Sequence, residues 1–350
     1  MKAARLYGPR DIRIDQVAEP RTPQAGEVLL AVRAVGVCGS DLHMVADGRI
    51  GDTAYDSPLV LGHEFMGEVL AVGADAADGW HRPLQVGQRV AVDPACPCRQ
   101  CEACEHGHPN LCPHHTFYGV YPTDGALQER MIVHAQNCFP IPDALNDDEG
   151  VLLEPLGVAI HALDLAHLKI AHSVAIIGCG PIGLLILRLA KLAGAGPIYA
   201  TDCFPWRVEL ARAWGATAAW TVDDGDPVER LMALAGGRGV DVAIEAAWAE
   251  HSIQQAADMA LPGGRLVLVG IPGDDRLVMQ HSTARRKGLT ILLARRMKHT
   301  YPRAIQLALA KDQLALADLV SHRFCLDEVN EAFRRNLAYE TGLQKVIITL

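Results

Sequence analysis

The pattern of apolar and polar residues changes along the chain and predicts two kinds of structure. Within residues 1–150, short segments alternate apolar and polar positions, as in residues 27–32 and 68–72. A period of two places successive side chains on opposite faces of a strand. The start, residues 1–16, alternates in the same way and predicts a pair of strands. We therefore expect an antiparallel β-barrel with long loops and little helix in this part.

From Ser173 onward, apolar strands alternate with helical segments. Residues 174–177 are an apolar strand followed by a helical stretch, and the same order recurs to residue 270. This alternation is typical of βαβ units and a parallel sheet. Residues 345–349 form a further apolar segment, which we expect to close the first domain as a strand. The predicted domains are residues 1–152 with 292–350, and residues 153–291.

Bulk composition excludes several classes of protein. The chain has 350 residues, which is room for two cores, and a formal net charge of -9. Nucleic-acid binders concentrate basic charge, so we expect no nucleic-acid partner. No stretch reaches the about 18 apolar residues of a membrane span, and the start does not resemble a signal peptide. Ten cysteines suit metal binding in a reducing compartment, so we expect a cytoplasmic protein without a membrane partner.

Half of the cysteines lie in one short segment, CPCRQCEACEHGHPNLC. Cys98, Cys101, Cys104 and Cys112 have the spacing C-x2-C-x2-C-x7-C, which can close a tetrahedral shell around one structural zinc ion. The alternative is a disulfide cluster, which is typical of small secreted domains and not of a long chain. Cys96 is a fifth candidate, but the spacing C-x-C is poor for chelation. We therefore predict a structural zinc lobe at about residues 93–115.

A glycine-rich turn follows the apolar strand at residues 174–177 and opens a helix. Its glycines form G-x-G-x-x-G, and Asp202 ends the next strand 19 residues after Gly183. The glycines permit a tight turn and close approach to a pyrophosphate, which the helix N-terminus attracts. Asp202 would accept hydrogen bonds from the adenosine ribose and repel a 2′-phosphate, so NAD is expected over NADP. The predicted cofactor residues are Gly178, Gly180, Pro181, Ile182, Gly183, Asp202 and Arg207.

A second set of possible metal ligands lies outside the cysteine-rich segment. Cys38 opens CGSDLH, and His63 and Glu64 follow 25 residues later. Thiolate, imidazole and carboxylate are all zinc ligands. Each residue alone could be a buried thiol, a core histidine or a solvated acid. Their occurrence together with a zinc lobe and a dinucleotide turn favours a catalytic metal site.

These motifs together resemble the zinc-containing medium-chain alcohol dehydrogenases, over the whole chain. The resemblance is carried by CGSDLH, GHExxGxVxxVG, the four-cysteine lobe and GxGxxG. It is closest to the sorbitol (polyol) dehydrogenase branch, through LLEPLGVAIHA, LVSHRF and the R-x-x-x-T-Y-P-x-A-I segment that begins at Arg296. It implies a GroES-like β-barrel catalytic domain, with a Rossmann doubly wound parallel sheet inserted between its two parts.

The resemblance also implies a role for individual residues. Cys38 and His63 would bind the catalytic zinc, with Glu64 or Glu154 as the further ligand. Asp41 would orient His63, as ligating imidazoles usually require. The remaining residues that it implies are Ser40 and His43 as a proton relay, and Ser40, Phe117, Glu154 and Arg296 as substrate contacts. For Ser40 and His43 a capping or surface role is the alternative, and for Phe117 ordinary packing.

The implied reaction is oxidation of a secondary alcohol to a ketone, with hydride transfer to NAD. The branch usually has polar residues where this chain has Met44, Met297 and His299, so a cyclitol, deoxy-polyol, smaller diol or sugar acid competes with sorbitol. L-threonine and butanediol dehydrogenases share the same motifs. A relative of another class, an inactive zinc-stabilised binding protein, would hold one zinc ion in place of two. The branch is commonly oligomeric, so a homotetramer or homodimer is expected.

Overall fold

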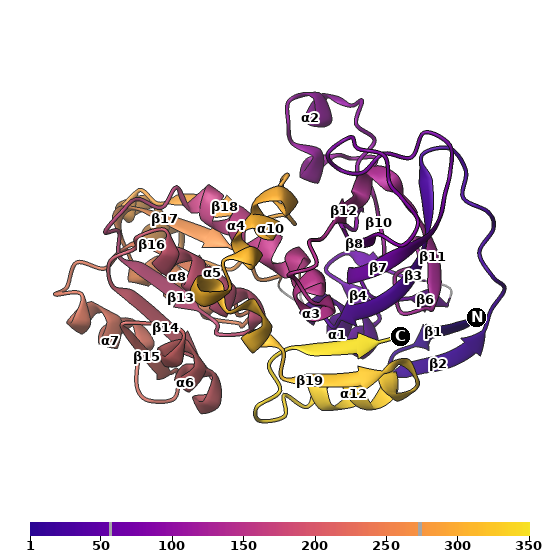
Figure 1. The fold of residues 1–350 in the computed structure, drawn as a ribbon. Helices are drawn as coiled ribbons and strands as arrows, with labels where there is room; N and C mark the ends of the chain where they lie inside the picture. The colour runs from indigo at the N-terminus through magenta and orange to yellow at the C-terminus, as the bar shows by residue number, and fades with distance from the viewer. Residues whose placement is uncertain (56–57, 272–274) are drawn as a thin grey trace. The chain divides into compact units, whose positions relative to one another are not determined.

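The computed structural model describes residues 1–55, 58–271 and 275–350, and these form two compact units (Figure 1). Met1–Glu154 and Tyr301–Leu350 form the first unit, and Pro155–Thr300 form the second. The predicted domain boundaries lay after residues 152 and 291. The observed division falls in the first turn of α4 (Leu153–Ala166) and directly before α10 (Tyr301–Leu309).

A seven-stranded sheet forms the centre of the first unit, in the order β12-β8-β7-β3-β20-β19, with β11 also paired to β3. Its pairs are antiparallel except for β19 with β20. The strands are β3 (Glu27–Gly36), β7 (Glu64–Val72), β8 (Arg89–Val92), β11 (Arg130–His134), β12 (Cys138–Pro140), β19 (His322–Cys325) and β20 (Val346–Thr349). The predicted closing strand is therefore confirmed, beginning at Val346. Because β20 pairs with β3, the two chain segments of the first unit share one sheet.

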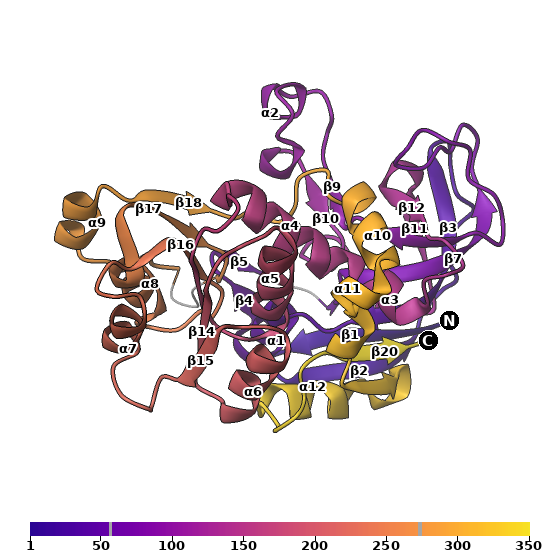
Figure 2. The ribbon, with the colours of Figure 1, turned by 60° about the vertical axis from the view of Figure 1, so that its left-hand side comes forward.

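Smaller elements complete the first unit. The predicted pair of strands at the start is an antiparallel hairpin of β1 and β2, joined by β6. The other strands and the helices are β1 (Lys2–Gly8), β2 (Asp11–Gln16), β4 (Arg49–Ile50), β5 (Thr53–Ala54), β6 (Leu59–Val60), β9 (Ala95–Cys96), β10 (Thr116–Phe117), α1 (Gly39–Asp47), α2 (Glu102–Glu105), α3 (Asp147–Val151), α10, α11 (Lys311–Leu314) and α12 (Val329–Leu337). Both views show α2 in a small lobe that stands apart from the sheet (Figures 1 and 2).

One hydrophobic core holds the strands of the first unit together. In β3, buried and less buried positions alternate from Glu27 to Val32, as the predicted period of two requires. The buried residues of β3 pack with those of β1, β7 and β20 and with α12. Gly67 lets β7 approach β3 closely, because a Cβ there would lie 2.6 Å from the carbonyl oxygen of Ala31. This core fixes the ends of β3 and β7, where several predicted site residues lie.

The second unit is a six-stranded parallel sheet in the order β15-β14-β13-β16-β17-β18 (Figure 1). Its strands are β13 (Val174–Ile177), β14 (Ile198–Asp202), β15 (Ala218–Thr221), β16 (Val240–Glu245), β17 (Ala260–Leu268) and β18 (Thr290–Leu293). The order is that of a doubly wound dinucleotide-binding fold. The predicted Rossmann sheet is confirmed. The direction of winding reverses between β13 and β16, and such folds bind ligands outside the carboxyl ends of the strands at that point.

The second unit has one helix before its first strand, α4, and further helices between its strands. They are α4, α5 (Pro181–Leu192), α6 (Pro205–Ala213), α7 (Pro227–Leu234), α8 (Ser252–Met259) and α9 (His281–Lys287). Pro181, Pro205 and Pro227 each open a helix, where a missing N–H and a fixed φ cost nothing. Among the described residues, no helix is long and apolar enough to cross a membrane.

Candidate active site

Three predicted ligands of the catalytic metal converge in the first unit. Cys38 directly precedes α1, and His63 and Glu64 lie at the start of β7. One ligand atom from each residue lies within 4.8 Å of the others, and both His63 and Glu64 are buried. A sulfur, a nitrogen and a carboxylate oxygen in this arrangement fit the ligand chemistry of zinc. The residues present therefore suit a catalytic zinc ion.

Asp41 connects two of these three residues. Its Oδ2 accepts a hydrogen bond from the backbone N–H of Cys38 at 3.0 Å, as part of a capping box that begins α1. Its Oδ1 lies 3.3 Å from Nδ1 of His63, so Nε2 is the nitrogen left for a metal. Burial opposes protonation of His63, but Asp41 and Cys38 outweigh it and raise its pKa well above the ordinary value. The site therefore attracts a cation to the imidazole.

Glu64 is paired with a lysine that the sequence pattern did not single out. The ammonium of Lys345 contacts Oε2 of Glu64 and donates a hydrogen bond to the carbonyl oxygen of Val37 at 3.0 Å. Gly36 leaves the space, because a Cβ there would lie 2.2 Å from that carboxylate oxygen. Lys345 directly precedes an apolar strand, a place where a lysine is usually solvated. A charged residue directly before a buried strand is the sequence signal that could have indicated a buried partner for Lys345.

Glu154, the other predicted carboxylate ligand, lies at the end of the first segment of the first unit. It is 5% exposed, and burial raises its pKa to about 8, with Glu64 adding to the shift and His63 opposing it. At neutral pH its carboxyl group can hold a proton. Glu154 is not among the three residues whose ligand atoms converge, so the structure favours Glu64 as the third ligand.

The predicted relay and one substrate contact lie beside the same site. Oγ of Ser40 is 3.4 Å from Nε2 of His63. Nδ1 of His43, one turn further along α1, is 3.5 Å from the carboxylate of Asp47. The ring of Phe117 lies 5.5 Å from the imidazole of His63, centroid to centroid. Met44, which we expected to make the substrate pocket less polar, is instead fully buried in the core.

The sulfur atoms of the four predicted cysteines of the lobe all lie within 4.8 Å of one another. Sγ of Cys112 lies 3.5 Å from Sγ of Cys98 and 3.8 Å from that of Cys101, which is 3.6 Å from that of Cys104. Disulfide sulfurs would be about 2.05 Å apart. A zinc–sulfur distance of about 2.3 Å gives a tetrahedron with edges of about 3.8 Å. The spacing therefore fits a zinc ion and excludes the disulfide alternative.

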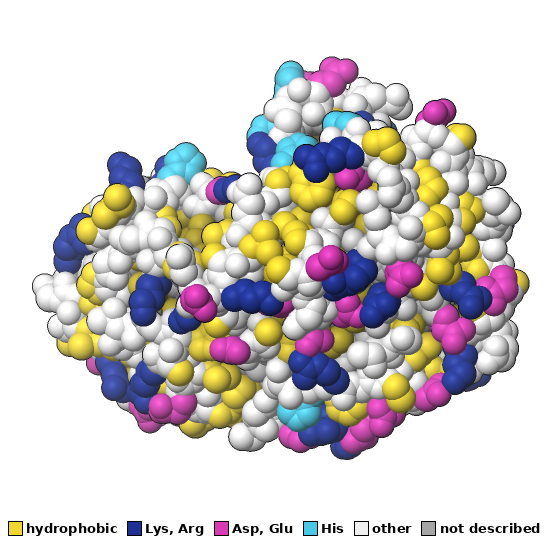
Figure 3. All heavy atoms as spheres, in the orientation of Figure 1, with side chains coloured by type: hydrophobic (Ala, Val, Ile, Leu, Met, Phe, Trp, Pro, Cys, Tyr) yellow, Lys and Arg dark blue, Asp and Glu magenta, His cyan; other side chains and the backbone are white. Residues whose placement is uncertain are grey.

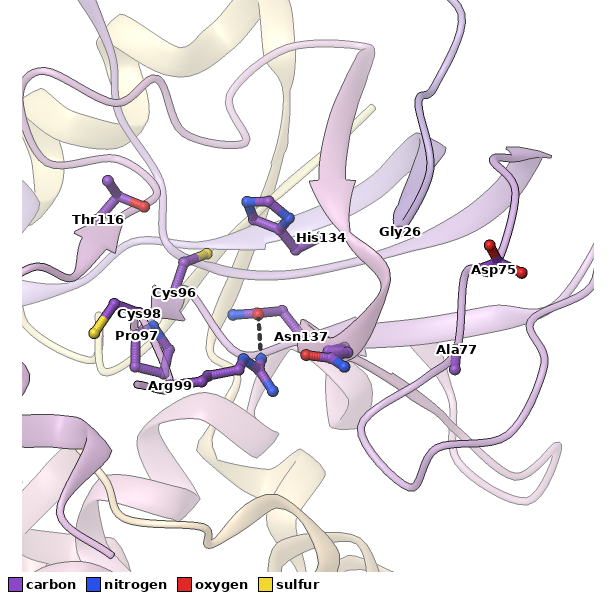
Figure 4. Close-up of a pocket in the computed structure, with 11 residues that line it drawn as sticks. Gly26, Asp75, Ala77, Cys96, Pro97, Cys98, Arg99, Thr116, His134 and Asn137 are labelled. Atoms are coloured by element: carbon purple, nitrogen blue, oxygen red, sulfur yellow. Dashed lines mark hydrogen bonds between the residues drawn. The ribbon is translucent and has the colours of Figure 1, made fainter. Parts of the chain in front are cut away.

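A separate pocket of about 430 Å³ lies next to this lobe (Figure 4). Cys96 and Cys98 line it, and the guanidinium of Arg99 reaches Oδ1 of Asn137 at 3.2 Å. Cys96 does not belong to the group of four converging thiols, as its spacing predicted. None of the residues that line this pocket belongs to the trio of Cys38, His63 and Glu64.

In the second unit, the predicted glycine turn joins β13 to α5. A Cβ on Gly183 would lie 1.9 Å from the carbonyl oxygen of Gly178, so this glycine allows the helix to pack closely. Gly178 has a φ of 100°, a positive value that glycine adopts readily and other residues rarely do. Gly180 faces open space, since a Cβ there would have no atom of the described residues within 4 Å beyond its chain neighbours. Pro181 and Ile182 begin α5 directly after it. The turn therefore leaves room for a phosphate group at the helix N-terminus.

Asp202 ends β14 beside this turn and accepts hydrogen bonds from two backbone N–H groups. Its Oδ2 accepts a hydrogen bond from the backbone N–H of Cys179 at 2.7 Å, and its Oδ1 accepts one from that of Phe204 at 2.9 Å. The guanidinium of Arg207 lies 4.0 Å from Oδ2. Arg207 also lies over the ring of Trp206, 5.1 Å from its centroid. Asp202 therefore helps to order the glycine turn.

Arg296, the predicted substrate contact, lies in the second unit. Its backbone is left-handed, with a φ of 57°, and it directly precedes the buried Met297. Met297 packs against α4, since a Cβ on Gly157 would lie 2.8 Å from its sulfur. The methionine is thus used in packing within the second unit.

Comparison with known proteins identifies the family of this chain. Residues 24–143 match the family model of the alcohol dehydrogenase GroES-like domain, and residues 181–310 match that of zinc-binding dehydrogenases. A sorbitol dehydrogenase of Bacillus subtilis is 36% identical over 348 residues, covering 99% of this chain and 97% of that protein. The chain belongs to the zinc-containing medium-chain alcohol dehydrogenases. It is thus a zinc-dependent alcohol dehydrogenase, with NAD as its cofactor.

Solved structures of this family have the same fold. The 2R,3R-butanediol dehydrogenase of Bacillus subtilis is 31% identical, with a TM-score of 0.87 and coverage of 100% of this chain and 99% of that one. An alcohol dehydrogenase of Escherichia coli CFT073 in complex with NADH is 29% identical, with a TM-score of 0.88 and coverage of 100% and 99%. The predicted combination of a GroES-like domain and a Rossmann domain is therefore confirmed.

Proposed function

We propose that this dehydrogenase oxidises a secondary alcohol of a polyol or small diol to a ketone, with NAD as the hydride acceptor. The observation that carries the proposal is the convergence of Cys38, His63 and Glu64 within 4.8 Å in a buried part of the first unit. The sorbitol dehydrogenase relative and the butanediol dehydrogenase structure support this substrate class.

The roles of the metal site follow from its contacts. Cys38, His63 and Glu64 would hold the zinc ion, which would supply a Lewis acid to lower the pKa of an alcohol hydroxyl. Asp41 fixes the imidazole orientation, and the ammonium of Lys345 balances the charge of Glu64. Glu154, with its pKa raised to about 8, holds a proton in the same buried region.

Two further residues are proposed to move a proton away from the substrate. Ser40 is close enough to His63 to accept a proton at Oγ from a hydroxyl bound beside the imidazole. His43 is the proposed next acceptor on α1. Burial lowers the pKa of His43, and Asp47 opposes the shift, so the imidazole is neutral and able to accept a proton at neutral pH.

Phe117 and Arg296 are the proposed substrate contacts. The apolar ring of Phe117 beside His63 would cover one face of the carbon chain. The guanidinium of Arg296 would donate hydrogen bonds to hydroxyl or carboxylate groups.

The Rossmann unit is proposed to prefer NAD over NADP. The turn of Gly178, Gly180 and Gly183 would hold the diphosphate with Pro181 and Ile182 at the helix start. The buried carboxylate of Asp202 would meet the ribose hydroxyls and oppose a 2′-phosphate. Arg207 would border the same ribose.

The experiment is a panel of polyols, diols, cyclitols and amino alcohols, including L-threonine, with NADH absorbance as the readout. We expect the highest kcat/KM for a polyol or diol. Cys38→Ala should abolish turnover and keep NAD binding, and the exposed Cys325→Ser serves as the matched control. Activity confined to L-threonine would contradict the proposed substrate class. A metal content of one zinc ion per wild-type chain would indicate an inactive relative.

A homodimer or homotetramer is the proposed assembly. Strand β18 is the last strand of the described parallel sheet, and such edges pair readily with another chain. Leu293 on this strand is 65% exposed, and Val278 is 63% exposed. Leu293→Lys should therefore shift the mass measured by light scattering toward the monomer, and an unchanged mass would contradict this interface.

The proposed compartment is the cytoplasm, and the proposed partners include neither nucleic acid nor membrane. None of the ten cysteines is in a disulfide bond, which is compatible with a reducing compartment. On the face shown in Figure 3, acidic and basic side chains are interspersed and form no basic patch.

A further inference from the structure

Trp248 holds a backbone conformation that a bulky residue rarely adopts. It lies three residues after β16, and its φ is 53°. In this left-handed region the Cβ crowds the following carbonyl oxygen, which is why glycine is the usual residue there. A bulky residue stays in such a conformation only where its surroundings fix it, and such positions are concentrated at functional sites.

One buried carboxylate fixes the turn that carries Trp248. Glu245 is 1% exposed, and its Oε1 accepts hydrogen bonds from the backbone N–H of Ala247 at 2.9 Å and of Trp248 at 2.8 Å. The hydroxyl of Ser252, at the start of α8, donates to the same oxygen at 2.8 Å. Three donors on one buried oxygen hold the backbone of Trp248 in place.

Two glycines make room for this turn on either side. A Cβ on Gly178 would lie 2.7 Å from the carbonyl oxygen of Ala246 and 2.7 Å from Cα of Ala247. A Cβ on Gly270, after β17, would lie 2.9 Å from the backbone nitrogen of Trp248. The turn is therefore packed against the first glycine of the dinucleotide turn.

The position of the turn in the sheet explains why this packing matters. β16 and β13 are neighbours, and the winding of the sheet reverses between them. The N–H of Ala246 donates to the carbonyl oxygen of Ile177 at 2.8 Å, so the pairing of β16 with β13 continues one residue beyond β16. Trp248, which is partly exposed, thus lies at the carboxyl end of the strands, at the point where such folds bind ligands.

The geometry points to Trp248 as the aromatic wall against which the adenine ring of NAD stacks. The turn packs against Gly178, directly after β13, and the other neighbour of β13 is β14, which ends at Asp202, the proposed ribose contact. An indole offers a large flat face for a purine without needing a hydrogen bond. This inference rests on NAD as the cofactor and adds a residue that selects for its adenosine half.

The test separates a strained functional residue from a structural one. Trp248→Gly should weaken the binding of ADP-ribose about tenfold by calorimetry, because the stacking face is lost. The same variant should keep or raise the melting temperature, because glycine relieves the left-handed strain. Binding of nicotinamide mononucleotide should stay unchanged.

Two comparisons complete the experiment. Tyr339→Gly relieves a similar φ of 49° in the first unit and should leave ADP-ribose binding unchanged. Trp248→Phe should keep most of the ADP-ribose affinity that Trp248→Leu loses, which decides the question if the glycine variant does not fold. Unchanged ADP-ribose affinity in Trp248→Gly or in Trp248→Leu would overturn the inference. Weaker binding of nicotinamide mononucleotide alone would also overturn it. Binding of NAD by the wild-type enzyme is measured separately, so its absence would count against the proposed function itself.

Discussion

The ammonium of Lys345 and the carboxylate of Glu64 form an ion pair in which each side chain is 2% exposed. Burial lowers the pKa of Lys345, but Glu64 and Cys38 outweigh this effect and raise it above the ordinary value. The lysine is therefore charged, and it compensates part of the negative charge that the metal ligands concentrate. A buried charge whose partner is removed costs much more than an exposed one.

Lys345→Met should lower the free energy of unfolding by about 3–5 kcal/mol, because Glu64 is left buried without its partner. The double variant Glu64→Gln with Lys345→Met should recover part of this loss. Lys311→Met is the matched control, since Lys311 also pairs with a buried glutamate, Glu149, but is itself 50% exposed. Urea denaturation measures all three, and an equal loss in both lysine variants would contradict the argument.

Cys104→Ser should reduce the zinc content from two ions per chain to one and lower the melting temperature. The sulfur of Cys104 is 3.6 Å from that of Cys101, and a structural zinc ion needs all four thiolates. Metal analysis by mass spectrometry gives the content. Cys96→Ser, two residues before Cys98, should keep both ions, and a loss of zinc in this control would show that the lobe uses a different set of thiols.

Asp41→Asn should weaken retention of the catalytic zinc by about 10–100-fold, since Asp41 orients His63 and caps the helix that begins after Cys38. Competition with a chromogenic chelator measures the affinity. Asp47→Asn changes a carboxylate on the same helix that is 60% exposed, and it should leave the affinity unchanged. Equal zinc affinity in wild type and Asp41→Asn would exclude this role.

The carboxylate of Glu27 should make stability depend on pH in the acid range. Its hydrogen bonds to Arg21, with a smaller contribution from the backbone of Gln24, lower its pKa from 4.5 to about 2. A carboxylate with a lowered pKa stabilises the folded state above its unfolded pKa and loses this effect as the pH falls toward its folded pKa.

Glu27→Gln should therefore cost about 1–2 kcal/mol at pH 6, after allowance for solvent screening, and progressively less between pH 4.5 and pH 2. Denaturation curves across this range measure the difference. Glu209→Gln, in an exposed pair with Arg212, should show almost no loss at any pH. A difference for Glu27→Gln that stays constant with pH would argue against the carboxylate.

Local patterns are enough to predict most of the fold. The strand at residues 174–177 is predicted to its ends, because four apolar residues before a glycine turn leave little choice. The pairing of the closing strand with β3 can be expected only through the resemblance, since a contact between residues so far apart has no local signal. The zinc-binding cysteines can likewise be predicted from their spacing, whereas the pairing of Glu64 with Lys345 cannot.

What cannot be predicted depends on burial that only the folded chain shows. The resemblance to the polyol branch places Met44 near the substrate pocket, but α1 buries it in the core. Cys179 fits the glycine turn as a small residue, yet its backbone N–H also binds Asp202. For Met44 the orientation of the side chain decides its role, and for Cys179 the orientation of the backbone N–H does. Neither orientation can be predicted from the residue type.

The hydrogen bond from Lys345 to Val37 spans 308 residues of sequence. During synthesis on the ribosome, the whole Rossmann unit emerges before this lysine does. β3 can pair with β20, and Glu64 with Lys345, only after the C-terminal segment has been made. The catalytic site is therefore completed after the cofactor unit has had time to fold. A chain stopped before Lys345 would carry every proposed zinc ligand and still lack the charge that balances them.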